Sequence, residues 1–243
     1  MSWEFHQAPT AFAQHAVDWD RLNAELYASH PYFDSRFVGP LLEYFASGQE
    51  QLCLYRQHGI VRAALILQPR GAGRWANFRP AQAQITPLLV ADFGLVAELM
   101  RVLPGFAWSI ELHAVDPRFA PAFSCARGDV IVTNHARTIG IEPQLGFAAY
   151  WRQRPSNLRS NIRRYANRVE REKGGTTLAS LVAPDAMAES VRRFGELESA
   201  GWKAAAGTAI SIGNTQGRFY AKVLGNFATT GQAEVCELSI RGQ

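Results

Sequence analysis

The chain has 243 residues, of which 47% are hydrophobic, and its formal net charge is +4. This proportion of apolar side chains suffices for one large core or two smaller ones, which excludes a disordered or fibrous protein. No apolar run approaches the roughly 18–20 residues of a membrane-spanning helix, and the N-terminal residues lack a secretory signal pattern, so we expect a cytoplasmic protein without a membrane span.

The first half of the chain alternates helical and strand-like patterns. Asp18 and Asp34 are expected to cap two amphipathic helices, and the period then changes to that of short strands separated by glycine- and proline-rich turns. This pattern predicts a largely antiparallel sheet with flanking helices. The expected helices cover 18–29, 34–47 and 93–103, and the expected strands cover 52–55, 60–68, 74–78, 107–113 and 129–140.

The composition changes near Pro143 to a helical, arginine-rich segment with few β-branched residues. We therefore place a domain junction near residues 141–147, with domains at 1–143 and 144–243. In the second domain, Met187, Val191, Phe194 and Leu197 are expected to form the buried face of one helix. The expected helices cover 156–173 and 215–230, with a further one that opens at residues 184–185, and the expected strands cover 176–182 and 233–240.

The segment from 148 to 175 concentrates the positive charge. This segment has eight Lys and Arg residues and two Glu residues, so its net charge is +6. Because the whole chain has a net charge of +4, the remaining residues together have a net charge of −2. In the helix expected there, Leu158, Ile162, Tyr165 and Val169 form an apolar stripe, and two arginine pairs, Arg159 with Arg163 and Arg164 with Arg168, line its flanks. These guanidinium groups either bind an anion such as phosphate or carboxylate or form a solvated polar face.

The usual catalytic motifs are absent from the sequence. There is no nucleophile elbow, no Walker loop and no histidine grouping with metal-ligand spacing, so we expect no metal. The match of residues 68–73 to an acyl-CoA loop is interpreted as a hairpin turn, because a strand-like segment follows it. Cys53, Cys125 and Cys236 are expected to be reduced core thiols. Trp202 and Lys203, at a helix end, can form a pocket wall and an anion contact or a core tryptophan beside a snorkelling lysine.

Several segments, in order, resemble the BioF/CelD-like branch of the GNAT acetyltransferase superfamily, which is related to the peptidoglycan-bridge aminoacyl transferases. They are Ser156–Ala166, Phe194–Lys203, Gly207–Ile210, Arg218–Tyr220 and Val235–Gly242, with His30–Phe33, Phe78–Gln82 and Asp116–Pro117 in the first half. The resemblance covers almost the whole chain, and the order and spacing of the segments are more specific than any one of them.

The resemblance implies an α+β protein with tandem GNAT-like domains, built from mixed, mostly antiparallel sheets. It implies transfer of an acyl group from acetyl-CoA or another acyl-CoA to an amine or hydroxyl of a small-molecule or saccharide acceptor, in polysaccharide or cell-envelope chemistry. By resemblance, Arg159 and Arg163 contact an anion, Trp202 and Lys203 shape the pocket, and Tyr220 packs nearby or supplies a hydroxyl. The general base is not identified.

Members of this branch continue beyond the strand that ends at Ile240, so the second domain is expected to be incomplete at its C-terminus and to expose a sheet edge. Two other functions stay open. The arginine-rich helix at 156–173 is one candidate for binding nucleic acid or another polyanion, although the slightly acidic remainder makes nucleic acid the weaker interpretation. The other is a non-catalytic scaffold that self-associates through the exposed sheet edge.

Overall fold

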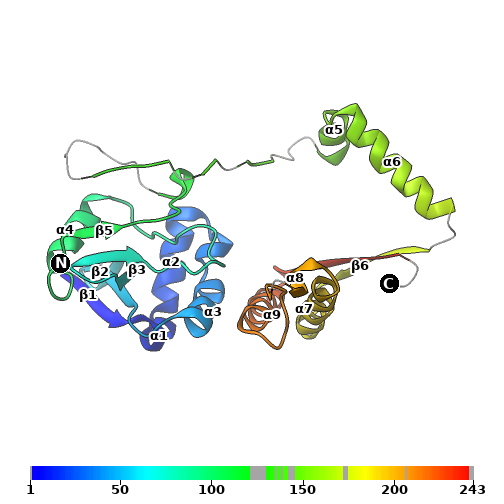
Figure 1. Ribbon diagram of the computed structural model, residues 1–243. Helices are drawn as coiled ribbons and strands as arrows, with labels where there is room; N and C mark the ends of the chain where they lie inside the picture. Colours follow the sequence, from blue (N-terminus) through cyan, green and yellow to red (C-terminus); the bar gives the residue numbers. More distant parts are fainter. Residues whose placement is uncertain are drawn as a thin grey trace.

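The computed structural model describes residues 2–120, 130–134, 136–137, 139–141, 146–171, 175–205 and 207–240. The protein is α+β, as expected: it has a mixed five-stranded sheet, a two-stranded antiparallel sheet and flanking helices. In Figure 1 the five-stranded sheet and its helices lie at one side, α7 to α9 with β6 lie beside them, and α5 and α6 stand apart. No helix among the described residues is long and apolar enough to cross a membrane.

The five-stranded sheet has the order β1-β2-β3-β4-β5. The first three pairings are antiparallel, which confirms the expected meander, and β4 pairs with β5 in parallel. The strands are β1 (Ser2–Gln7), β2 (Gln51–Gln57), β3 (Ile60–Pro69), β4 (Arg74–Asn77) and β5 (Ser109–Glu111). The edge strand β1 was not expected from the sequence, although Trp3 and Phe5 alternate with polar residues as a half-buried strand requires.

A strand expected over 129–140 is wrong for the described residues of that range, which belong to no strand or helix. Val130, Ile131 and Val132 are β-branched but exposed. High β-propensity reflects packing on a half-buried sheet surface, and these residues have no such surface beside them.

The turn at residues 70–73 is a hairpin, as expected, because the Arg70 N–H donates to the Arg74 carbonyl at 2.8 Å.

Helices α2 (Ala16–Tyr27), α3 (Ser35–Phe45) and α4 (Gly94–Val102) accompany this sheet, together with the short α1 (Ala8–Ala11) and the 3-10 turns η1 (Phe12–His15), η2 (Pro31–Phe33) and η3 (Pro117–Phe119). Asp34 caps α3 as expected, since its side chain accepts from the Arg36 N–H at 2.9 Å. The expected cap at Asp18 is wrong: α2 starts before it, and Asp18 pairs with Arg21 instead.

The sheet has a core on each face. Along β2, Leu52 and Leu54 pack with α2 and α3, whereas Cys53 and Tyr55 pack with α4 on the opposite face. This alternation is the period of two that a strand imposes. The buried Cys53 is the core thiol that we expected; Cys236 is exposed, so that expectation is wrong for it, and Cys125 lies outside the described residues.

The second half contains the helices α5 (Gly146–Arg152), α6 (Ser156–Arg171), α7 (Pro184–Ser199), α8 (Trp202–Ala205) and α9 (Thr215–Ala228) and the paired strands β6 (Thr176–Leu181) and β7 (Val235–Ile240). The expected burial of α7 is wrong in part. Met187 and Val191 are buried, but Phe194 is 48% exposed and Leu197 73%. The buried side runs instead through Ser190 and Gly195, where α7 approaches the loop before α9.

Helix α9 joins the second half to the core of the first. The ring of Phe219 is fully buried, with its centroid 5.7 Å from that of Phe37 and 5.3 Å from that of Phe45, both in α3. Two hydrogen bonds add to this contact: Arg36 Nη1 donates to Thr230 Oγ1 at 2.6 Å, and Asn226 Nδ2 donates to the Arg36 carbonyl at 3.2 Å. One hydrophobic cluster therefore includes side chains from both halves.

Candidate binding cavity

A cavity of about 610 Å³ lies where α7, α9 and β7 meet the segment 31–37 and the loop 82–84. We call it the α9 cavity. Its volume is in the range of small-molecule sites, which are mostly apolar with a few polar groups. Its lining residues are Pro31, Tyr32, Phe37, Gln82, Gln84, Ser190, Val191, Phe194, Ile210, Tyr220, Val223, Leu224, Phe227, Gln232, Ala233, Glu234 and Val235.

The walls of the α9 cavity are apolar. Helix α9 supplies Val223, Leu224 and Phe227 at helical spacing, so one face of α9 runs along the cavity. Phe194 of α7 lies opposite and also lines the cavity. These side chains favour an acyl chain or another apolar group over a charged one.

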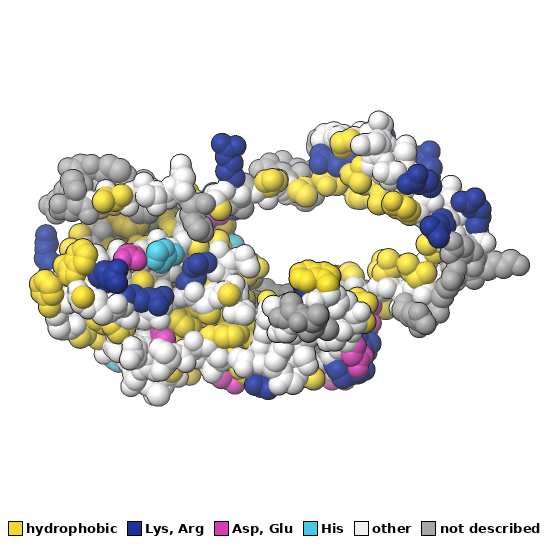
Figure 2. Space-filling model, in the orientation of Figure 1, with side chains coloured by type: hydrophobic (Ala, Val, Ile, Leu, Met, Phe, Trp, Pro, Cys, Tyr) yellow, Lys and Arg dark blue, Asp and Glu magenta, His cyan; other side chains and the backbone are white. Residues whose placement is uncertain are grey.

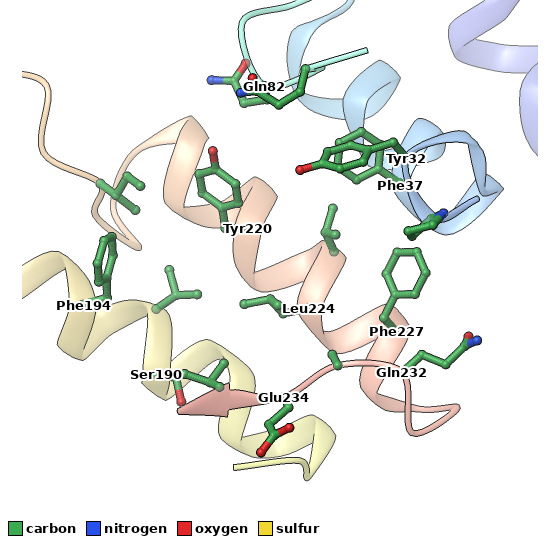
Figure 3. Close-up of a pocket in the computed structure, with 17 residues that line it drawn as sticks. Tyr32, Phe37, Gln82, Ser190, Phe194, Tyr220, Leu224, Phe227, Gln232 and Glu234 are labelled. Carbon is green, nitrogen blue, oxygen red and sulfur yellow. The ribbon is translucent and has the colours of Figure 1, made fainter. Parts of the chain in front are cut away.

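Uncharged polar groups lie at one end of the cavity. Figure 3 shows the hydroxyl groups of Tyr32 and Tyr220 and the side-chain amide of Gln82 around this end, from three separate segments of the chain. None of the three makes a side-chain hydrogen bond with another described residue. Two phenolic hydroxyls and an amide provide donors and acceptors for the carbonyl, hydroxyl or amide of a ligand.

Glu234, the one acidic residue among the described lining residues, lies at the other end of the cavity. Ser180 Oγ donates to the Glu234 carboxylate, and the Cys236 thiol lies 3.7 Å from the same oxygen, Oε1. The negative charge of Glu234 raises the pKa of the Cys236 thiol. Ser190 at this end is buried and donates to the Ala186 carbonyl at 2.9 Å, so its hydroxyl proton is already used.

The loop that precedes α9 fixes one wall of the cavity. A Cβ atom added at Gly195 would lie 2.5 Å from the Ile210 carbonyl oxygen, and one at Gly217 would overlap the Ser211 carbonyl. Asn214 caps α9: its Oδ1 accepts from the Gly217 N–H at 2.8 Å, and its Nδ2 donates to the Ala209 carbonyl at 2.9 Å. Because the backbone of this loop lies so close to Gly195 and Gly217, neither position has room for a side chain.

Glu198 attaches the same loop to the end of α7. Its Oε2 accepts from the Ile210 N–H at 2.9 Å, and its Oε1 accepts from Lys203 Nζ. The hydrogen bond from Ile210, with that from Lys203, lowers the pKa of Glu198. Lys203 is thus the partner of a carboxylate in this structure and does not line the α9 cavity.

The structure separates the site residues expected from the sequence. Tyr220 lines the cavity and Phe219 lies in the core behind it, but Trp202 is 76% exposed on α8 and is not among the lining residues. Arg159 and Arg163 are exposed on α6, which stands away from α9 (Figure 1). Arg163 borders a shallow polar hollow on α6 itself, formed with Ser160, Arg164, Asn167, Glu170 and Arg171.

Sequence reasoning missed most of the lining. Tyr32 and Gln82 lie inside segments that carry the resemblance, but no sequence signal indicated that they face α9 from the first half. Glu234 lies directly before β7 and was read as ordinary strand sequence. Among the described residues no group of three or more His, Cys, Asp or Glu side chains is placed to hold a metal ion.

No family model, no curated protein and no solved structure matches the chain.

Proposed function

We propose that the protein is an acyltransferase that moves an acyl group from acyl-CoA or a related activated donor to an amine or hydroxyl acceptor, and that the α9 cavity holds the reacting groups. The observation that supports this proposal is an apolar cavity that, among its described lining residues, has uncharged hydrogen-bonding groups at one end and the carboxylate of Glu234 at the other. The mixed, mostly antiparallel sheet of the first half agrees with the fold that the resemblance implies.

In this proposal the acceptor nitrogen or oxygen forms a bond to the acyl carbon while the carbon–sulfur bond of the donor breaks, and the proton of the acceptor ends on the departing thiolate. The Tyr220 hydroxyl donates a hydrogen bond to the acyl oxygen, where negative charge develops. Glu234 lies at the opposite end of the cavity from Tyr220, out of reach of the same reacting carbon, and is assigned a hydrogen bond to a distant amine or hydroxyl group of the acceptor.

The cavity fits the acyl and acceptor portions of the substrates better than the phosphates of a coenzyme A donor. Among the described residues that line it there is neither lysine nor arginine. Phosphate groups are best recognised by arginine or lysine side chains or by helix N-termini, so we assign the phosphates of such a donor to solvent outside the cavity.

The proposal is tested with the Tyr220→Phe variant, which keeps the ring and removes the hydroxyl group. Calorimetry first establishes whether the wild-type chain binds acetyl-CoA, and acyl transfer to a panel of amines and sugars is then measured. We expect Tyr220→Phe to lower kcat about 100-fold, as for the loss of one oxyanion donor, with little change in donor affinity. Tyr44→Phe is the control, since Tyr44 also packs on this core but does not line the cavity.

Glu234→Gln is the companion variant. It preserves the shape of the side chain, and the loss of a charged hydrogen-bond partner for the acceptor predicts an increase in the KM for the acceptor of about tenfold, with little change in kcat. If the wild-type chain neither binds acyl donors nor transfers acyl groups, or if both variants keep full activity, the proposed function is wrong.

A further inference from the structure

Helix α6 combines two features that α9 and the core helices do not share. It exposes an apolar stripe, with Ile162 48% and Tyr165 54% exposed, and it has no buried residue. It is also rich in cations: residues 146–171 contain seven arginines and one glutamate. The arginine pair Arg159 and Arg163 makes no ion pair with another described residue.

The arginines lie on both sides of the stripe. At 100° per residue, Leu158, Ile162, Tyr165 and Val169 fall within a narrow sector, Arg159 and Arg163 lie on one flank, and Arg164 and Arg168 lie on the other. Figure 2 shows hydrophobic side chains along one edge of the α5–α6 segment, with Lys and Arg side chains beside them. Helix α5 adds Phe147, 73% exposed and stacked on Trp151 at 5.8 Å.

We propose that α5 and α6 bind an anionic lipid surface, with the apolar stripe of α6 in the acyl boundary and its arginine flanks at the lipid phosphates. A helix that lies in a bilayer interface is strongly amphipathic but polar overall, has basic residues on its polar side and carries aromatic residues on the other. Long arginine side chains beside such a stripe extend to the headgroups while their methylene groups stay in the apolar layer.

An anionic lipid surface matches both the charge and the apolar stripe of α6 better than a nucleic acid or a protein face does. A nucleic acid would neutralise the arginines but leave the apolar stripe in water. A second alternative partner is the exposed face of the β6–β7 ribbon, where Leu178 and Leu238 lie opposite each other. This face, from the same chain or from a second copy, would cover the apolar stripe of α6. Within the strands that face carries no acidic residue, because Glu237 points to the other side and pairs with Arg193, and Glu234, just before β7, is already hydrogen-bonded by Ser180. An anionic bilayer covers the stripe and neutralises the flanks together.

The proposal is tested by sedimentation of the full chain with vesicles of phosphatidylcholine alone and of phosphatidylcholine mixed with phosphatidylglycerol. We expect binding to the mixed vesicles and at least about tenfold weaker binding to the neutral ones. The double variant Arg159→Glu/Arg163→Glu is expected to lose binding to the mixed vesicles by about tenfold or more, since each basic residue near an anionic surface contributes to attraction. The matched control is Arg62→Glu/Arg101→Glu, which changes the net charge equally at exposed positions of β3 and α4.

A second variant separates the apolar contribution. Ile162→Ser keeps a similar helix propensity and removes the centre of the stripe, so we expect vesicle binding to fall by about tenfold, whereas Val17→Ser, at an exposed position of α2, has no effect. Circular dichroism shows whether each variant remains folded.

Three results would overturn the proposal. One is equal binding to neutral and mixed vesicles. Another is binding of duplex DNA that the arginine reversal abolishes and Ile162→Ser leaves unchanged, which would identify a polyanion-binding helix. The third is an absence of vesicle binding together with a dimer in light scattering that Ile162→Ser dissociates, which would identify the stripe as an interface between copies. These measurements do not involve the α9 cavity, so they stand apart from the test of acyl transfer.

Discussion

The guanidinium carbon of Arg36 in α3 lies 4.4 Å from the ring centroid of Phe227 in α9, although 190 residues separate the two in the sequence. Asp34, the N-cap of α3, holds Arg36 in this position: its carboxylate accepts from Arg36 Nε at 2.8 Å and from Arg36 Nη2 at 2.6 Å. Phe227 in turn lines the α9 cavity. The pair therefore links the cap of α3 to the wall of the candidate site.

Phe219 is the central apolar contact between α9 and α3. Because its ring is fully buried against Phe37 and Phe45, Phe219→Ala is expected to lower the free energy of unfolding by about 3–5 kcal/mol. Urea denaturation monitored by circular dichroism measures this change. Phe147→Ala, at an exposed ring of α5, is the control and is expected to change stability by less than about 0.5 kcal/mol. Equal effects of the two substitutions would show that α9 does not pack on α3.

Replacement of two helical glycines by alanine is predicted to change the stability of the protein in opposite directions. Gly195→Ala places a Cβ against the Ile210 carbonyl, so we expect a destabilisation of about 1–3 kcal/mol and a displaced cavity wall. Gly225→Ala in α9 meets no atom within 4 Å and is expected to stabilise the protein by up to about 1 kcal/mol, because alanine favours a helix. Thermal unfolding of both variants checks the prediction, and a stabilised Gly195→Ala would contradict it.

Asn77 connects the end of β4 to the segment after β5. Its Nδ2 donates to Thr86 Oγ1 at 2.7 Å, and its Oδ1 accepts from the His113 N–H at 2.7 Å. Asn77→Ala would leave the His113 N–H without this partner, so we predict a loss of about 1–3 kcal/mol of stability. Asn167→Ala, on the exposed face of α6, is the matched control; denaturation midpoints that shift equally would argue against the network.

The Tyr27 hydroxyl links α2 to the segment after β4. It donates to the Leu88 carbonyl at 2.8 Å, and burial raises the pKa of Tyr27 to about 12. An unfolded tyrosine ionises near pH 10, so the folded state favours the neutral form. The stability from this group is complete below pH 10 and is lost as the pH rises through about 12.

Tyr27→Phe removes this titration, and we expect the variant to lose less stability than the wild type between pH 10 and pH 12. Urea midpoints at several pH values in this interval measure the difference. Parallel pH profiles for the two proteins would show that Tyr27 is not protected from ionisation.

Local patterns in the sequence predicted most of the elements. The meander β2–β3–β4, helices α3, α4, α7 and α9 and the ribbon strands β6 and β7 follow from hydrophobic period, turn residues and caps such as Asp34, all of which act within a few residues. The arginine-flanked stripe of α6 was predicted for the same reason. The strand expected at 129–140 was wrong for the described residues of that range because a strand depends on a partner, which local sequence does not specify.

The candidate site was decided only by the tertiary structure. The sequence by itself determined that Tyr220 follows the buried Phe219 on an amphipathic helix, but not that α9 packs on α3 and so brings Tyr32 and Gln82 to the same cavity as Tyr220 and Glu234. Such contacts join residues more than a hundred positions apart. They result from burial of complementary apolar faces, which is non-directional and leaves no short-range pattern in the chain.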